Sequence, residues 1–129
     1  MEVYIKKSIK NMSFEQAEAL VKEKLSEQGF GIVSEINMQT TFKNKLDVDF
    51  RPYKILGACN PKFAHSAIQS NDMVGVALPC NVCLQQKENK VVEVFAVNPL
   101  VAMEPLQTPE IATLGQTVYE RLNAAIEAL

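Results

Sequence analysis

The sequence predicts a two-layer α+β domain, in which a mainly antiparallel sheet of about five strands carries two long helices on one face. Two segments, 14–28 and 109–129, place apolar residues at helical spacing, and five other segments alternate or run apolar in the manner of strands. A wholly polar stretch at 85–90 joins two of these strands as a hairpin. Strands that follow one another in this way favour an antiparallel sheet.

The composition is that of one ordinary folded domain. A chain of 129 residues with 47% hydrophobic and 22% charged residues has the usual size for a single core, so we expect one domain over 1–129. No apolar run approaches the ~20 residues that cross a bilayer, and we expect no membrane partner. Thirteen basic and fifteen acidic residues give a net charge of −2 without a basic cluster, so nucleic acid is not an expected partner.

The N-terminus and the cysteines together predict a cytoplasmic protein. Residues 1–6 lack the charged and then apolar pattern of a signal peptide. The three cysteines are an odd number without dense spacing. They fit free cysteines in a reducing compartment better than a disulfide framework.

The first elements are a strand and a helix. Apolar and polar residues alternate over about 2–9, which predicts a half-buried strand. Ser13 and Gln16 have the spacing of a capping box, and an apolar stripe then runs over about 14–28. Gly29 can take the left-handed conformation that ends a helix.

A second strand is expected at about 30–37, where apolar and polar residues alternate again. The stretch 39–51 is harder to interpret. Its apolar residues can form a short helix, while three charged side chains are expected in solvent: Asp47, Asp49 and Arg51.

The middle of the chain predicts a strand, a short helix and a long strand. Segment 53–59 is apolar on both faces, as in a covered central strand. Asn60 is a favoured N-cap and Pro61 suits the first helical position. Alternation over 74–84 predicts the longest strand, and Pro79 inside it indicates an edge or a bulge, because proline donates no ladder hydrogen bond.

The last third predicts a hairpin, a loop and the second long helix. Asn89 can adopt a positive φ in the hairpin loop, and a strand follows at 91–97. A loop is expected at 98–105. Thr108 caps the helix at 109–129. Because two strands are apolar on both sides, the sheet face opposite the helices is expected to be covered by a second molecule or a ligand.

Several motifs resemble, in this order and spacing, the domain-of-unknown-function 302 family of small bacterial and archaeal proteins. The matching residues are Gly29 to Ile32, Tyr53 to Leu56, Cys59 to Pro61, Leu78 to Cys80, and Val82. The similarity covers about residues 2–100. It implies a fold similar to the TATA-binding-protein-like domains and a homodimer, and it implies no activity. After Cys80 the chain departs from the family pattern, with Asn81 and Cys83.

The candidate ligand site lies where two predicted strands each carry a thiol beside a proline. The candidate ligand-binding residues are Cys59, Asn60, Pro61, Pro79 and Cys80. If the two strands are neighbours, both sulfur atoms converge near the start of the short helix. The helix N-terminus would then favour a thiolate at Cys59.

Packing thiols are the simpler interpretation of these cysteines. Cys80 and Cys83 have the two-residue separation of metal and redox sites, with Cys59 and His65 potentially close. In an unbroken strand, however, positions three apart face opposite sides of the sheet. His65 lies off the apolar stripe of its helix and is expected in solvent.

No set of catalytic residues is recognisable, so a binding role is more strongly indicated than an enzymatic one. The chain has one histidine, no clustered glycines, and a pair of carboxylates without an apolar pocket to separate their pKa values. We therefore predict a dimeric binding domain for a small apolar molecule or a protein partner, without a cofactor. Its apolar cleft would lie between a curved sheet and the loop around residues 100–103. The alternative is a thiol-based metal-binding or redox protein that uses Cys59, Cys80 and Cys83.

Overall fold

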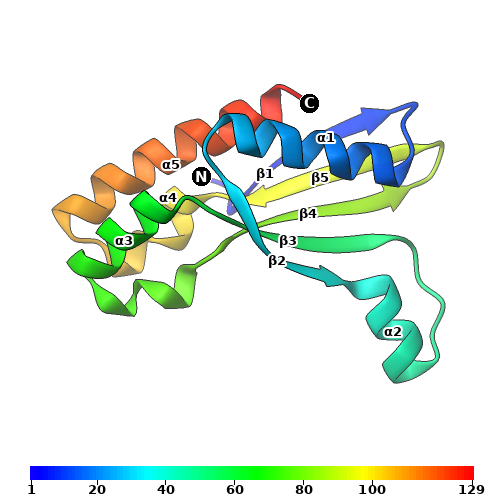
Figure 1. Ribbon diagram of the computed structural model, residues 1–129, viewed down its shortest axis with the longest axis horizontal. Coiled ribbons are helices and arrows are strands. Elements are labelled where there is room, and N and C mark those ends of the chain that lie inside the picture. Colours follow the sequence, from blue (N-terminus) through cyan, green and yellow to red (C-terminus); the bar gives the residue numbers. More distant parts are fainter.

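The computed structural model describes residues 1–129 and shows one five-stranded sheet with helices against one of its faces (Figure 1). The strands are β1 (Tyr4–Lys10), β2 (Gly31–Asn37), β3 (Tyr53–Cys59), β4 (Cys80–Lys87) and β5 (Val91–Val97). The helices are α1 (Phe14–Glu27), α2 (Met38–Leu46), α3 (Pro61–Ser70), α4 (Pro99–Ala102) and α5 (Pro109–Glu127), with short 3-10 helices η1 (Asp72–Ala77) and η2 (Glu104–Leu106). The predicted α+β fold class is confirmed.

The sheet has the order β1-β5-β4-β3-β2, and every neighbouring pair is antiparallel. The middle strand is β4, so β1 and β2 are the two edges. The register places Leu56, Val82 and Ala96 in one row across three strands, and all three are fully or almost fully buried. This row faces α1 and α5.

The expectation of a long strand over 74–84 is wrong. The strand begins at Cys80, Pro79 lies outside it, and the strand is central and not at an edge. Residues 72–77 instead form η1, because the side chain of Asn71 accepts a hydrogen bond from the Met73 amide and starts a helical turn. Only Val74 of this turn is buried.

The two long helices begin where the capping signals place them. In α1, Ser13 Oγ accepts from the Gln16 amide at 3.1 Å, and Gln16 Oε1 accepts from the Ser13 amide at 3.0 Å. Gly29 follows the helix with a φ of 86°. In α5, Thr108 Oγ1 accepts from the Ile111 amide at 3.2 Å. Both helices lie on the same face of the sheet (Figure 1).

The main core lies between this helical layer and the sheet. Its largest fully buried side chains include Leu25 of α1, Leu122 of α5 and Leu56 and Leu84 of the sheet. Each aliphatic side chain of this size contributes roughly 1.5–3 kcal/mol through burial. A smaller cluster around Val74 and Met103 extends the core toward α3 and η1.

Two connecting segments differ from the expected loops. The segment 98–105 forms α4 and η2, and Asn98, only 3% exposed, caps α4 by accepting from the Leu100 amide at 3.0 Å. The hairpin strand β4 runs on to Lys87, so the loop is shorter than 85–90. Asn89 has the expected positive φ, at 59°.

We call residues 38–50 the arm, and the side of the sheet opposite α1 and α5 the open face. The arm consists of α2 and the loop after it, and it projects away from the body of the molecule (Figure 1). Asn37 caps α2 by accepting from the Thr40 amide at 3.0 Å, which confirms a short helix in this stretch. None of the chain's helices has the length and apolar character that crossing a membrane requires.

Candidate functional site

One enclosed apolar pocket lies at the end of the sheet where β3 and β4 meet α3. It has a volume of about 30 Å³ and is lined by 12 residues, 11 of them hydrophobic. The sheet contributes Ala58, Cys59 and Cys80, while α5 contributes Leu114 and Val118. Helix α3, Phe30, Leu78 and Met103 complete the wall, so the pocket joins the two clusters of the core.

The turn from β3 into α3 positions the outer wall of this pocket. Asn60 Oδ1 accepts from the amides of Lys62 and Phe63, at 3.1 and 3.2 Å, and so fixes the first turn of α3. Phe63 then lies against the pocket, and the guanidinium of Arg121 lies 5.2 Å from the centre of its ring. Arg121 also donates to the carbonyl of Gln28 at 3.3 Å, which ties α5 to the end of α1.

Three of the five residues proposed from the sequence line the pocket, and the two prolines do not. Cys80 pairs with Ala58 in the sheet register, so the end of β3 and the start of β4 bring Cys59, Asn60 and Cys80 to one place. Pro61 begins α3 and is exposed. Pro79 lies against Gly57, where a side chain would collide with Pro79 and with Ser34.

Most of the remaining lining residues were missed because they come from distant parts of the chain. The loop around residues 100–103 was expected to border an apolar cleft, and Met103 does line the pocket, whereas Phe63 was not connected to the cysteines. Leu114 and Val118 belong to the apolar stripe of α5. A stripe of this kind predicts burial, but it does not show which part of the stripe borders a pocket.

Two of the three thiols, Cys80 and Cys83, are poorly suited to metal or redox chemistry. Burial, with a smaller contribution from neighbouring Cys59, raises the pKa of Cys80 to about 11. Burial also raises the pKa of Cys83 to about 11. Both groups therefore stay protonated near neutral pH, whereas the thiolate is the nucleophile and the metal ligand.

The geometry also separates Cys80 from Cys83. Cys80 faces the helices, while Cys83 pairs with Ile55 and Phe95 and faces the opposite side. No group of three or more His, Cys, Asp and Glu side chains is placed to hold a metal ion, no disulfide joins the cysteines, and His65 is exposed.

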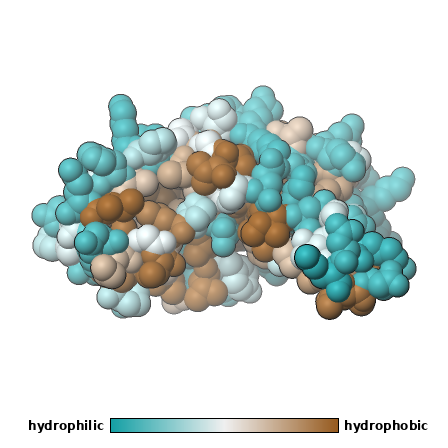
Figure 2. Space-filling view, turned by 60° about the horizontal axis from the view of Figure 1, so that its bottom comes forward, coloured by the Kyte–Doolittle hydropathy of each residue, from teal (hydrophilic) through white to brown (hydrophobic).

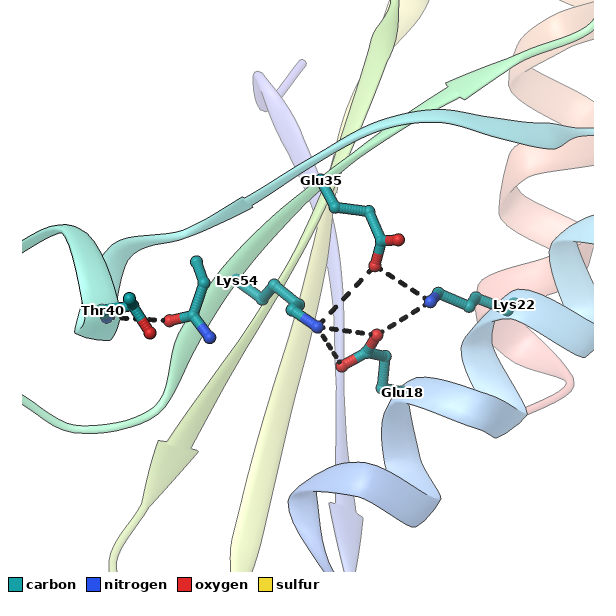
Figure 3. A network of polar contacts seen from close by, with 6 residues as sticks. Glu18, Lys22, Glu35, Thr40 and Lys54 are labelled. Carbon is teal, nitrogen blue, oxygen red and sulfur yellow. Dashed lines mark hydrogen bonds and ion pairs between the residues drawn. The ribbon is translucent and has the colours of Figure 1, made fainter.

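A network of ion pairs connects α1 to β2 and β3 at the other end of the sheet (Figure 3). Lys54 Nζ lies 2.9 Å from a carboxylate oxygen of Glu18 and 3.7 Å from one of Glu35. Lys22 Nζ lies 2.9 Å from a carboxylate oxygen of Glu18 and 3.0 Å from one of Glu35. Burial alone would raise the pKa of Glu18, but hydrogen bonds from Lys22 and Lys54 outweigh it, so the pKa is lowered. Each of these four charged side chains has an oppositely charged partner, so the network holds α1 against the sheet.

The open face carries a row of aromatic residues that begins in the arm. The rings of Phe42 and Phe50 make an edge contact with their centres 5.1 Å apart. The ring centre of Tyr53 lies 6.4 Å from that of Phe50 and 6.1 Å from that of Phe95. Arg51 is exposed, as expected, and its guanidinium lies 4.4 Å from the centre of the Phe50 ring.

The polar groups beside this row are linked to one another. Arg51 Nε donates to Gln85 Oε1 at 3.0 Å, and Gln85 Nε2 donates to Glu93 Oε1 at 2.8 Å. Asp47 and Asp49 are likewise exposed as expected, and both pair with Lys43, at 3.0 and 3.2 Å. An apolar recess of about 240 Å³ lies between the arm and the sheet, lined by Met38, Phe42, Phe50, Tyr53 and Ile55.

These features define a class of small two-layer α+β proteins with an apolar pocket at one end of the sheet and an uncovered sheet face. The chain belongs to the DUF302 family, a domain of unknown function, which matches residues 5–129. This confirms the resemblance found in the sequence.

The crystal structure of an uncharacterized conserved DUF302 protein from Bacillus stearothermophilus is similar to this chain. The two have a TM-score of 0.88 and 21% sequence identity, and the match covers 98% of each chain. No functionally curated protein matches the chain. The comparison with the crystal structure therefore establishes the fold alone.

Proposed function

We propose that the protein is a non-enzymatic binding module that works as a homodimer in the cytoplasm. Its pocket beside Cys59, Asn60 and Cys80 takes the apolar part of a small molecule. The observation that carries this proposal is the composition of the pocket wall, in which 11 of 12 residues are hydrophobic and Asn60 is the only polar one. Mostly apolar walls with very few polar groups are typical of ligand sites.

The size of the pocket defines how a ligand would enter. A volume of about 30 Å³ is far below the roughly 300–1,000 Å³ of pockets that enclose whole ligands. In its present form the pocket admits a group no larger than one or two water molecules. A larger apolar group enters only if a wall residue moves outward.

Phe63 is the wall residue best placed to move. It is only half-buried, it belongs to a helix of ten residues, and its contact with Arg121 is on the surface. The backbone around it is held by the Asn60 cap and by Pro61, so the side chain can rotate without loss of the helix. In this arrangement Asn60 and Pro61 shape the entrance of the pocket, and neither of them contacts the ligand through a charge.

Benzene is a suitable probe, because apolar cavities of sufficient size bind it from water. Phe63→Ala removes the mobile wall and should strengthen benzene binding by about tenfold or more relative to the wild type. Ala64→Leu fills the same space and should abolish binding. The measurement is the shift of amide NMR signals around the pocket during a benzene titration.

Phe14→Ala is the matched control, because Phe14 is another half-buried phenylalanine that packs at the core away from the pocket. This variant should leave the response of the pocket signals unchanged. If the signals around Phe63, Ala67 and Met103 do not respond to benzene in the Phe63→Ala variant, the pocket is ordinary core packing and the proposed ligand site is wrong.

A further inference from the structure

The arm lacks the packing that a short helix normally needs. Helix α2 has nine residues and none of them is buried, and the following residues to Asp49 are exposed as well. Leu46 and Val48 are 65% and 45% exposed. Isolated helices of this length are marginal in water, because tertiary packing of an apolar face supplies most helical stability. The single chain provides little of that packing.

The open face is also uncovered, and it is continuous with the arm. The aromatic row leads from Phe42 across Tyr53 to Phe95, and the recess of about 240 Å³ lies at the junction. Two further large residues on this side, Ile36 and Tyr4, are 48% and 44% exposed. Figure 2 turns this side toward the reader and shows hydrophobic patches among polar residues, one of them on the projecting arm.

From these observations we infer that the open face and the arm together form the contact surface for a second copy of this chain. The two sheets pack face to face, and each arm closes over the β1 edge of the other copy. This inference rests on the homodimer proposed above and assigns its surface. The apolar residues of the arm then gain the packing that they lack within one chain.

The area of the surface agrees with this assignment. Strands spaced about 4.8 Å apart, each with about seven residues rising 3.3 Å, give the five-stranded sheet a face of roughly 550 Å². Stable interfaces bury about 800 Å² on each partner. The sheet face alone falls short of that area, so a stable contact of this face has to include the arm as well.

The charges on the surface select one orientation of the two copies. Lys6 and Lys10 lie on the open face at the β1 edge, because they pair with Phe95 and Val91 in the register. If the twofold axis of the dimer ran across the strands, Lys6 and Lys10 of one copy would lie over the same lysines of the other copy. If the twofold axis runs along β4, the middle strand, then β1 of one copy lies over the arm of the other copy, where Asp47 and Asp49 are exposed. The lysines of β1 are then kept away from their own copies, and they lie near two carboxylates that pair with Lys43 of the same arm, at 3.0 and 3.2 Å, within the single chain.

Sedimentation velocity of point variants tests this surface. Ile36→Glu and Leu46→Glu place a charge on residues that are exposed in the single chain, so folding should be preserved while dimerisation weakens by about tenfold or more. Val76→Glu is the matched control, since Val76 is 83% exposed but lies on η1, outside the open face and the arm. This control should dimerise like the wild type.

The possible results separate this inference from the ligand site. A wild-type chain that sediments as a monomer at about 100 µM would contradict the homodimer itself. A dimeric wild type with undiminished dimers of both variants would show that another surface carries the contact. Benzene binding to the pocket should be equal in Leu46→Glu and wild type, because the pocket lies at the opposite end of the molecule from the arm (Figure 1).

Discussion

Among single residues, Glu18 has two charge partners in the network between α1 and the sheet, Lys22 and Lys54, each at 2.9 Å. Its folded-state pKa is lowered from its ordinary value of 4.5, so its contribution to stability is present above that value and is lost as the pH falls through the folded pKa. Lys22 behaves in the opposite way. Its pKa is raised from 10.5, so its contribution is present below that value and is lost at higher pH.

We therefore expect Glu18→Gln to lower the free energy of unfolding by about 1 kcal/mol at neutral pH, because Lys54 and Lys22 lose their closest partner. The difference from the wild type should shrink when the pH is lowered from 7 to about 3, because the contribution of the carboxylate is lost as the pH falls through its folded-state pKa. Urea unfolding at the two pH values measures this. Glu23→Gln is the control, because Glu23 is exposed on the same helix and forms no ion pair. An equal difference at both pH values would show that Glu18 acts through packing alone.

The cysteines show how far single residues could be assigned from the sequence. Cys59 and Cys80 were placed together because consecutive antiparallel strands usually lie side by side, and the Ala58 to Cys80 pairing agrees. The opposite directions of Cys80 and Cys83 followed from the alternation of a strand. The role of Phe63 could not be predicted, because it depends on how α3 packs against α5.

At the scale of elements, local capping signals were the reliable guides. Helices α1, α3 and α5 begin at their expected caps, since a cap is a contact between residues two or three positions apart. The alternation of Val74, Val76 and Leu78 was misleading. The Asn71 cap starts η1, which contains Val74 and Val76 and ends before Leu78, and in it Val74 is buried while Val76 is 83% exposed.

This difference between η1 and a strand has a direct test. In a strand, Val74 and Val76 would face the same side and contribute alike to the core. In η1, Val74→Ala should lower the free energy of unfolding by about 2 kcal/mol, because it leaves a cavity beside Met103, while Val76→Ala should change it by less than about 0.5 kcal/mol. Urea denaturation of both variants provides the comparison, and equal losses would restore the strand assignment.

At the scale of the whole molecule, the two proposed activities use separate regions. The pocket lies beside α3, whereas the arm projects at the other end (Figure 1). Apolar residues on both faces of two strands were the sequence signal for a covered sheet, and the single chain covers one face only. The sequence could not show that the arm belongs to the same surface, because this depends on how Phe50 packs beside Tyr53 and on the contact of Tyr53 with the distant Phe95.

Cys83 provides a native probe for the assembled molecule. It lies on the middle strand and faces away from the helices, so face-to-face packing would cover it. Because burial raises its pKa to about 11, alkylation by iodoacetamide is best followed at about pH 9, where some thiolate forms. Its rate should fall by about fivefold or more when the protein is concentrated from monomer to dimer.

The Leu46→Glu variant should keep the faster alkylation rate of Cys83 at the higher concentration. Cys59 lines the pocket and serves as the internal reference, since its rate should not depend on concentration. A Cys83 rate that is equally independent of concentration in a dimeric sample would place the contact elsewhere.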